Sequence, residues 1–330
     1  MLILAQTDAF ATFVATITRA VALGCIYAVV ALGFVIVFKA TQVLNFAHGG
    51  IAMAGALFLS IMVNDDGFPF LPFGNPFVGD EPPGLAIWLL MLALAMVLTA
   101  ILAMVLERVA IRPMVGQPLF ALAIITLGIE IAISAFNRDA VNTPDARTLH
   151  IPWGVDQWEI FGARVNHSYL AAVIAALFSF GVVFFFYRSR LGVAMRAVAF
   201  DQEAAMAQGI NVGRVFQIAW AIGGALACLG AVIYAMAPFG PQGAVSADLH
   251  PVLAFRALPV IILGGLDSVT GALIGGLVIG GAEVLAGQYF SDYTTVLGVG
   301  YQAIVPYVIM LGVLLVRPYG LFGTEEIRRV

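Results

Sequence analysis

The sequence predicts an all-α, polytopic membrane protein that forms a single domain over residues 1–330. Hydrophobic residues make up 62% of the chain and charged residues only 10%, and the mean hydropathy is +1.02. Runs of about 18 or more apolar residues, long enough for an α-helix to cross a bilayer, recur along the whole chain. A transmembrane β-barrel would instead show segments of about ten residues with alternating hydrophobicity.

The apolar runs number about nine, and we expect each to form a helix. They cover residues 11–38, 47–63, 85–106, 118–136, 168–187, 215–236, 251–266, 270–288 and 300–316. The second and seventh runs are short for a hydrocarbon core of about 30 Å. Either could be a broken or re-entrant helix buried in protein, so the sequence predicts about eight or nine transmembrane helices.

The distribution of charge orients these helices. The basic residues on one set of connections, which the positive-inside rule assigns to the cytoplasm, are Lys39, Arg108, Arg112, Arg188, Arg190, Arg196, Arg214, Arg317, Arg328 and Arg329. The opposite connections carry most of the acidic residues. We therefore expect the N-terminus outside the cell and the C-terminus in the cytoplasm. Of the two long outer connections, the proline-rich one at about 64–84 predicts an irregular loop, and Trp153 and Trp158 in the other suit an interfacial aromatic belt.

Two groups of polar residues interrupt the apolar runs. Asn45, Phe46, His48 and Gly49 belong to a Gly-flanked break that we expect to line a translocation pathway, because broken helices are tolerated only inside protein or beside a cavity. A cytoplasmic turn capped by the asparagine is the alternative.

Three charged residues fall within apolar runs: Glu130, Arg256 and Glu283. A charge at the bilayer centre costs roughly 2.5–3.5 kcal/mol, so each is expected to have a structural or gating role. Arg256 and Glu283 are the expected ion pair, and the role of Glu130 is open. Close helix packing is expected at Gly271-x-x-x-Gly275 and at Gly276-x-x-x-Gly280, either within the chain or against a second permease.

The most polar internal segment lies at about 188–214, on the cytoplasmic side. Residues 201–208 favour a short helix, which Asp201 can cap at its N-terminus and Gly209, in a left-handed conformation, can end. We expect small Ala204 and Ala205 on the surface of this helix, where a groove of another protein could approach them. An ordinary interfacial helix or a loop is the alternative.

The same segment resembles a known signature. Glu203-Ala204-Ala205-x-x-x-Gly209 is similar to the EAA-x-x-x-G motif of permease subunits of bacterial ABC importers, although the later I-x-L-P portion of that motif is absent. In that family the loop is the coupling helix that docks into the ATPase subunit. The resemblance implies ATPase-coupling roles for Arg196, Asp201, Glu203, Ala204, Ala205, Gly209 and Asn211, with Glu203 and Arg196 supplying charge complementarity.

The rest of the chain resembles the branched-chain amino acid (LIV-type) ABC permeases, near the H subunit. The blocks that carry this resemblance are Gly24 to Gly33 with Asn45 to Gly49, Glu107 to Pro113, Arg190 to Asn211, and Leu263 to Gly276 with Glu283 and Arg317 to Gly323. The resemblance implies a type II-like importer permease of the bacterial inner membrane that forms half of an alternating-access pathway. It also implies a second permease subunit, two cytoplasmic ATPases and a periplasmic binding protein. Branched-chain amino acids are the implied cargo, with urea, short amides or other small amino acids as alternatives.

The chain is not expected to power transport itself. A P-loop needs a lysine after a glycine-rich turn, and the only lysine is Lys39, between Phe38 and Ala40. ATP and magnesium are therefore expected to bind to partner subunits. This chain is expected to bind no cofactor, no metal and no nucleic acid. A self-sufficient secondary transporter or channel would also lack a P-loop and is the rival class. A membrane enzyme is not expected, because the sequence shows no set of nucleophile, base and orienting residue.

Overall fold

The computed structural model describes residues 2–64, 83–114, 117–141, 147–236, 238, 243–245, 249–291, 298 and 300–324. Within these ranges, 6 helices are long and apolar enough to cross a membrane. Three shorter apolar helices accompany them, His48–Val63, Phe255–Gly264 and Tyr301–Val316. The prediction of about eight or nine helical segments is confirmed, and the second and seventh are indeed short. The last segment, Tyr301–Val316, matches its expected range, with a 3-10 turn ahead of its α-helical part.

The helices follow the apolar runs closely. Their bounds are α1 Leu2–Thr41, α2 His48–Val63, α3 Leu85–Leu106, α4 Leu119–Val141, α5 His167–Arg188, α6 Arg190–Phe200, α7 Gln202–Ala207, α8 Val212–Met236, α9 Leu249–Gly264, α10 Val269–Tyr289 and α12 Val305–Val316. A π-helical turn, η1 (Glu107–Ile111), and a 3-10 turn, η2 (Arg112–Met114), continue α3, and a second 3-10 turn, η4 (Tyr301–Ala303), precedes α12.

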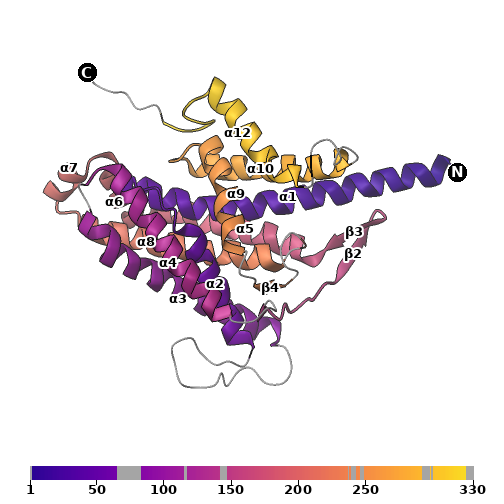
Figure 1. The fold of residues 1–330 in the computed structure, drawn as a ribbon, viewed down its shortest axis with the longest axis horizontal. Coiled ribbons are helices and arrows are strands. Elements are labelled where there is room, and N and C mark those ends of the chain that lie inside the picture. Colours follow the sequence, from indigo (N-terminus) through magenta and orange to yellow (C-terminus); the bar gives the residue numbers. More distant parts are fainter. Residues whose placement is uncertain are drawn as a thin grey trace.

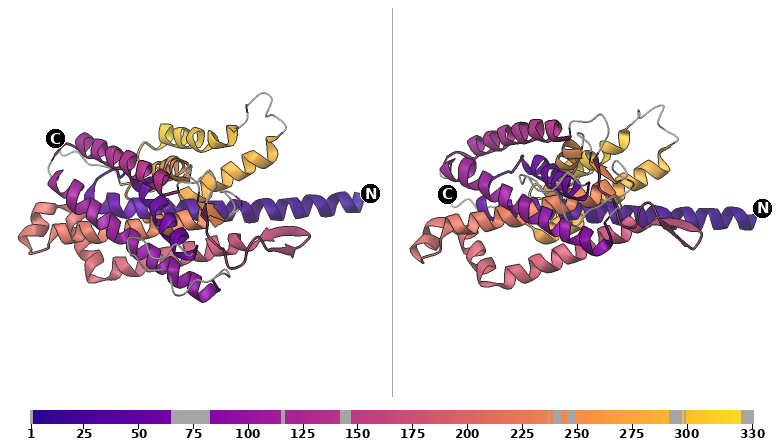
Figure 2. Two further views of the ribbon diagram at one scale, coloured as in Figure 1. Left: turned by 60° about the horizontal axis from the view of Figure 1, so that its bottom comes forward. Right: turned by 90° about the horizontal axis from the view of Figure 1, so that it is seen from below.

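One long helix organises the molecule. α1 runs along most of the length of the molecule and packs most extensively against α10 and α8 (Figures 1 and 2). In its 18-residue apolar window 89% of the residues are buried, and the value for α8 is 78%. All but one residue of the short α2 are buried as well, so α2 is a core helix rather than a surface one.

Glycines set the distance between these core helices. A Cβ added to Gly276 on α10 would lie 2.7 Å from the backbone nitrogen of Ala28 and the backbone oxygen of Gly24, both on α1. A Cβ on Gly275 would lie 2.6 Å from the backbone oxygen of Val260 on α9. The close packing expected at these glycines is therefore made within the chain.

The outer helices carry a different pattern of burial. Only 22% of the apolar window of α3, 28% of that of α4 and 22% of that of α5 is buried. Their exposed side chains are large and apolar, including Leu90, Ile131 and Phe185. A surface of this kind faces lipid or a neighbouring subunit.

Two small antiparallel sheets occupy the connections, and the β2–β3 sheet lies toward the end where α1 begins (Figure 1). β2 (Gln157–Ile160) pairs with β3 (Ala163–Asn166), and β1 (Arg147–Thr148) pairs with β4 (Ala244–Val245). Trp158 lies on the exposed strand β2, whereas the indole nitrogen of Trp153 donates to Ser168 Oγ at 3.0 Å. The other long connection, the proline-rich one, lies mostly outside the described residues.

Candidate functional site

The polar segment forms two short helices, α6 and α7, at the end of the molecule opposite the start of α1 (Figure 1). Ser189 begins α6, since its Oγ accepts a hydrogen bond from the backbone N–H of Gly192 at 3.2 Å. Asp201 separates the two helices and caps α7, with Oδ1 accepting from the N–H of Ala204 at 2.9 Å. The N-cap role expected of Asp201 is confirmed.

The C-terminus of α7 closes as a Schellman motif. Gly209 has φ +80°, in the left-handed region where a side chain is strained. The N–H of Ile210 donates to the oxygen of Ala205 at 3.0 Å, and the N–H of Gly209 donates to the oxygen of Met206 at 2.9 Å. This is the pair of hydrogen bonds that defines the motif, so the expected role of Gly209 is confirmed.

The outward face of α7 differs from expectation at one residue. Glu203 and Ala204 are exposed, but Ala205 is only 4% exposed and belongs to the hydrophobic core cluster. The prediction that both alanines lie on the surface is wrong for Ala205. A helix of six residues packed beside α8 must turn one side inward, and the sequence does not say which.

Two large apolar side chains near Ala205 in the sequence lie on the surface instead. Phe200, the last residue of α6, is 95% exposed, and Met206 is 55% exposed. Sequence reasoning missed both, although an aromatic residue within a polar segment was an available signal. Together with Glu203 and Ala204 they give the tip of the molecule an apolar, partly acidic surface, which we call the α7 surface.

Arg196 does not belong to that surface. Its Nη1 donates to the backbone oxygen of Tyr187, so it closes the corner between α5 and α6. The residue is itself exposed, so the charge complementarity expected of it stays a prediction.

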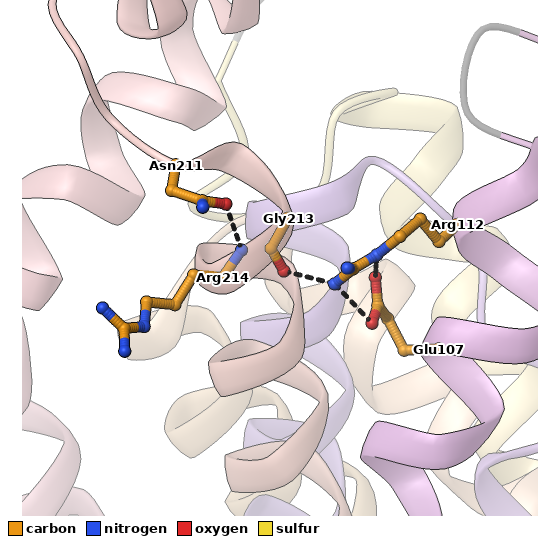
Figure 3. Close-up of polar contacts among 5 residues, drawn as sticks. All are labelled: Glu107, Arg112, Asn211, Gly213 and Arg214. Carbon is orange, nitrogen blue, oxygen red and sulfur yellow. Dashed lines mark hydrogen bonds and ion pairs between the residues drawn. The ribbon is translucent and has the colours of Figure 1, made fainter.

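The chain leaving α7 is fastened to the end of α3 (Figure 3). Asn211 begins α8, because its Oδ1 accepts from the N–H of Arg214 at 2.9 Å. Arg112 Nη2 donates to the backbone oxygen of Gly213 at 2.7 Å. The same guanidinium makes two 3.1 Å hydrogen bonds to the carboxylate of Glu107, whose side chain is 0% exposed.

This arrangement, which we call the Arg112 tie, was not foreseen as a functional element. Glu107 and Arg112 stand five positions apart, and the π-helical turn η1 between them brings both onto one face. π-Helical turns inside longer helices are frequent at functional sites. The tie connects a membrane-spanning helix directly to the segment that follows α7.

The expected ion pair inside the membrane is present. Arg256 Nη1 lies 2.5 Å from Glu283 Oε1 and donates to Tyr27 Oη at 2.8 Å. Tyr27 Oη in turn donates to Glu283 Oε2 at 2.8 Å, which closes a three-membered network. The three side chains come from α9, α10 and α1. Arg256 and Glu283 also border a polar cavity of about 240 Å³ that Arg19 lines. Tyr27 was not foreseen, because nothing in the sequence separates it from other tyrosines.

Glu130, which lies on α4, caps the N-terminus of α2. Its Oε2 accepts from the N–H of Gly50 at 2.8 Å, and its Oε1 accepts from Ser134 Oγ at 3.1 Å. Gly50 lies in the first turn of α2, whose N-cap residue, Ala47, makes no side-chain cap. A carboxylate is stabilised at this position because the first turn offers unpaired N–H groups and a positive dipole end.

The polar break lies beside a second cavity. Residues 46–47 between α1 and α2 form a turn, but the side chain of Asn45 does not cap α2, so the capping role in the alternative is wrong. His48 is 3% exposed and its Nε2 lies 3.1 Å from the backbone oxygen of Val30. Among the described residues, Oδ1 of Asn45 is buried without a hydrogen-bond partner.

That cavity has a volume of about 180 Å³. Asn45, Phe46, His48 and Glu130 line one side of it, and apolar residues of α1, α4 and α9 line the rest. The buried Gly49 does not line it. The structure therefore brings three of the four predicted pathway residues together with Glu130. Within the described residues, no three His, Cys, Asp or Glu side chains gather as metal ligands.

Comparison with known proteins places the chain in a family. Residues 16–314 match the family described as branched-chain amino acid transport system / permease component. The chain is 30% identical to the high-affinity branched-chain amino acid transport system permease protein BraD of Pseudomonas aeruginosa, over 93% of this chain and 94% of that protein. It is 29% identical to the permease protein LivH of Escherichia coli, over 98% of this chain and 100% of that protein.

A solved structure is similar at lower identity. It is described as an inward-facing conformation of a metal-chelate type ABC transporter, with a TM-score of 0.47 and 14% identity, over 91% of this chain and 86% of that one. The family match covers most of the chain and agrees with its multi-pass helical architecture. This protein belongs to the branched-chain amino acid transport permease family and is a membrane-spanning permease subunit of an ABC transporter.

Proposed function

We propose that this chain forms half of the pathway of an ATP-driven importer for branched-chain amino acids. The observation that carries the proposal is α7, a capped helix that projects an exposed Glu203-Ala204 pair and two apolar side chains from one end of the membrane bundle. The cargo is inferred from the relatives, which are named as branched-chain amino acid permeases. Urea, short amides and other small amino acids are the alternative cargoes.

The α7 surface is the proposed docking site for a separate ATPase subunit. Phe200 and Met206 supply apolar anchors that would be buried on docking, and Glu203 supplies charge at their side. The Arg112 tie offers a route for the resulting movement, because it joins the first turn of α8 to the end of α3. Movement of α7 would then shift two membrane helices together.

The cavity beside Asn45 is the proposed stretch of the pathway within this subunit. Its two acceptors, the unpartnered oxygen of Asn45 and the carboxylate of Glu130, suit a protonated amine. Its remaining walls, including Phe34, Phe255 and Leu258, suit a branched aliphatic side chain. Both properties belong to a zwitterionic branched-chain amino acid.

The membrane orientation follows from the same proposal. α7 lies in the cytoplasm, the start of α1 and the β2–β3 hairpin lie outside, and the C-terminus is cytoplasmic in the bacterial inner membrane. The proposed complex contains a second permease, two cytoplasmic ATPases that bind ATP and magnesium, and a periplasmic binding protein. The type II-like architecture remains a prediction.

Reconstituted transport tests this proposal against a self-sufficient transporter or channel. Proteoliposomes that contain the chain alone should show no leucine flux, and the assembled complex with binding protein and ATP should show uptake that stops without ATP. Leucine flux through the chain alone, at the rate of the complex, would overturn the proposal. Identifying the ligand that copurifies with the binding protein separates the alternative cargoes.

A further inference from the structure

A third cavity, of about 720 Å³, opens near the α6–α7 end of the bundle. α1, α5, α6, α10 and the segment that contains Phe322 and Thr324 contribute its walls. It takes no part in the coupling or the pathway proposed above. Its walls comprise an apolar part along the membrane helices and a polar part at the α5–α6 corner.

The apolar part follows the outer face of α5. Leu177 is 70% exposed and Phe184 is 52% exposed, and Phe180 and Leu273 complete this wall. Because α5 buries only 22% of its apolar window, this side of the cavity is open to the surroundings of the bundle. Where this side of the bundle faces the bilayer, those surroundings are hydrocarbon chains.

The polar part carries two cations and an unused donor. Lys39 Nζ donates to the backbone oxygen of Asp267 at 3.1 Å and lies 5.5 Å from the ring centre of Tyr187. Arg196 lines the cavity beside them. Among the described residues, Tyr187 Oη is buried without a hydrogen-bond partner.

The balance of charge favours an anion. One carboxylate, that of Asp267, lines the cavity, but it accepts from the N–H and the hydroxyl of Thr324. Arg188 adds a positive charge at the rim, with its guanidinium 4.2 Å from the ring centre of Phe184. Hydrocarbon beside a cluster of Lys and Arg at the cytoplasmic surface is the combination that recognises anionic lipid head groups.

We propose that this cavity binds an anionic phospholipid from the leaflet on the α6–α7 side. An acyl chain lies along Leu177, Phe180 and Leu273, and the phosphate lies against Lys39, Arg196 and the hydroxyl of Tyr187. A second copy of this chain is a poorer occupant, because it would have to bury the cations of this corner against protein. Free phosphate would leave the apolar wall uncovered. The lipid would brace the corner from which α6 and α7 project.

The single lysine permits a direct test. Reductive methylation with ¹³C-formaldehyde labels Lys39 and the terminal amine, and it keeps the positive charge. The Lys39 signal is identified by its loss in a Lys39→Arg variant. The full-length chain is placed in nanodiscs of phosphatidylcholine, and phosphatidylglycerol is then substituted in steps. The Lys39 signal should shift and saturate as phosphatidylglycerol increases.

Two variants and a matched control define specificity. Arg196→Gln should raise the phosphatidylglycerol fraction at the midpoint about fivefold, as expected for one lost cation near the surface. Tyr187→Phe keeps the aromatic ring but removes the hydroxyl, and it should also raise the phosphatidylglycerol fraction at the midpoint. Arg190→Gln removes the same charge from an exposed residue of the same helix that does not line the cavity, and it should leave the midpoint unchanged.

Four results would overturn the proposal. The first is a Lys39 signal that stays fixed throughout the titration, and the second is an equal shift when inorganic phosphate is added to phosphatidylcholine discs. The third is a midpoint raised as much by Arg190→Gln as by Arg196→Gln, which would indicate general surface attraction. The fourth is a signal that depends on the number of chains per disc, which would place a second copy in the cavity.

Discussion

The close contact between α1 and α10 supports a prediction with an internal control. Gly276→Ala and Gly281→Ala make the same chemical change in the same helix. At Gly276 the new methyl group would lie 2.7 Å from backbone atoms of Ala28 and Gly24, which cannot rotate away. At Gly281 nothing lies within 4 Å of the added carbon.

The magnitudes follow from these distances. Each substitution gains up to about 0.8–1.0 kcal/mol of helix propensity. Only Gly276→Ala adds the cost of overpacking, about 1–3 kcal/mol. The propensity gain cancels between the two variants, so Gly276→Ala should be less stable than Gly281→Ala by about 1–3 kcal/mol. Gly281→Ala should equal or exceed the wild type.

Unfolding in mixed detergent micelles, titrated with sodium dodecyl sulfate and followed by tryptophan fluorescence, measures this difference. Both variants should unfold in one transition with the slope of the wild type. If the two free energies of unfolding agreed within about 0.5 kcal/mol, the close α1–α10 approach would be refuted.

Three further outcomes can be checked with the same methods. Arg112→Gln should lower the free energy of unfolding by about 3–5 kcal/mol in the same titration, since it leaves the carboxylate of Glu107 buried and unpaired. Adding Glu107→Gln should recover part of that loss, and purely additive losses would contradict the tie. Gly209→Val should strain the end of α7 by about 1–2 kcal/mol and weaken retention of the ATPase in a pull-down. Gly209→Asn should be tolerated, because asparagine adopts the left-handed conformation more readily, and equal retention in both variants would argue against the left-handed cap. Glu283→Ala should lower the unfolding midpoint more than the double variant with Arg256→Ala, because only the single variant leaves the guanidinium without its carboxylate; the reverse order would exclude a paired role.

Features that depend on neighbouring residues could be predicted from the sequence. The position and length of each apolar run predicted where the helices lie, and the two short runs correspond to α2 and α9. Asp201 and Gly209 end α7 through hydrogen bonds to neighbours in the chain, so their roles could be inferred from residue type. The pairing of Arg256 with Glu283 could be predicted because charges in an apolar run need partners.

Features that depend on distant contacts could not be predicted. Glu130 caps a helix that lies 80 residues away in the sequence, and Arg112 reaches the backbone oxygen of Gly213 from 101 residues away. Neither partner is marked by residue type, since Gly50 and Gly213 act through backbone atoms. The inward orientation of Ala205 was missed for a related reason, because six residues do not define a buried face.

The central claim is that a separate ATPase drives this permease through the α7 surface. Glu203→Arg tests it most directly, with ATPase retention in a pull-down and ATP-dependent leucine uptake as the two readouts. Glu159→Arg, the same change on the exposed β2 strand at the opposite end, is the control for retention. Loss of both retention and uptake in Glu203→Arg, with retention intact in Glu159→Arg, is the predicted result. Full retention and full uptake in Glu203→Arg would contradict the claim.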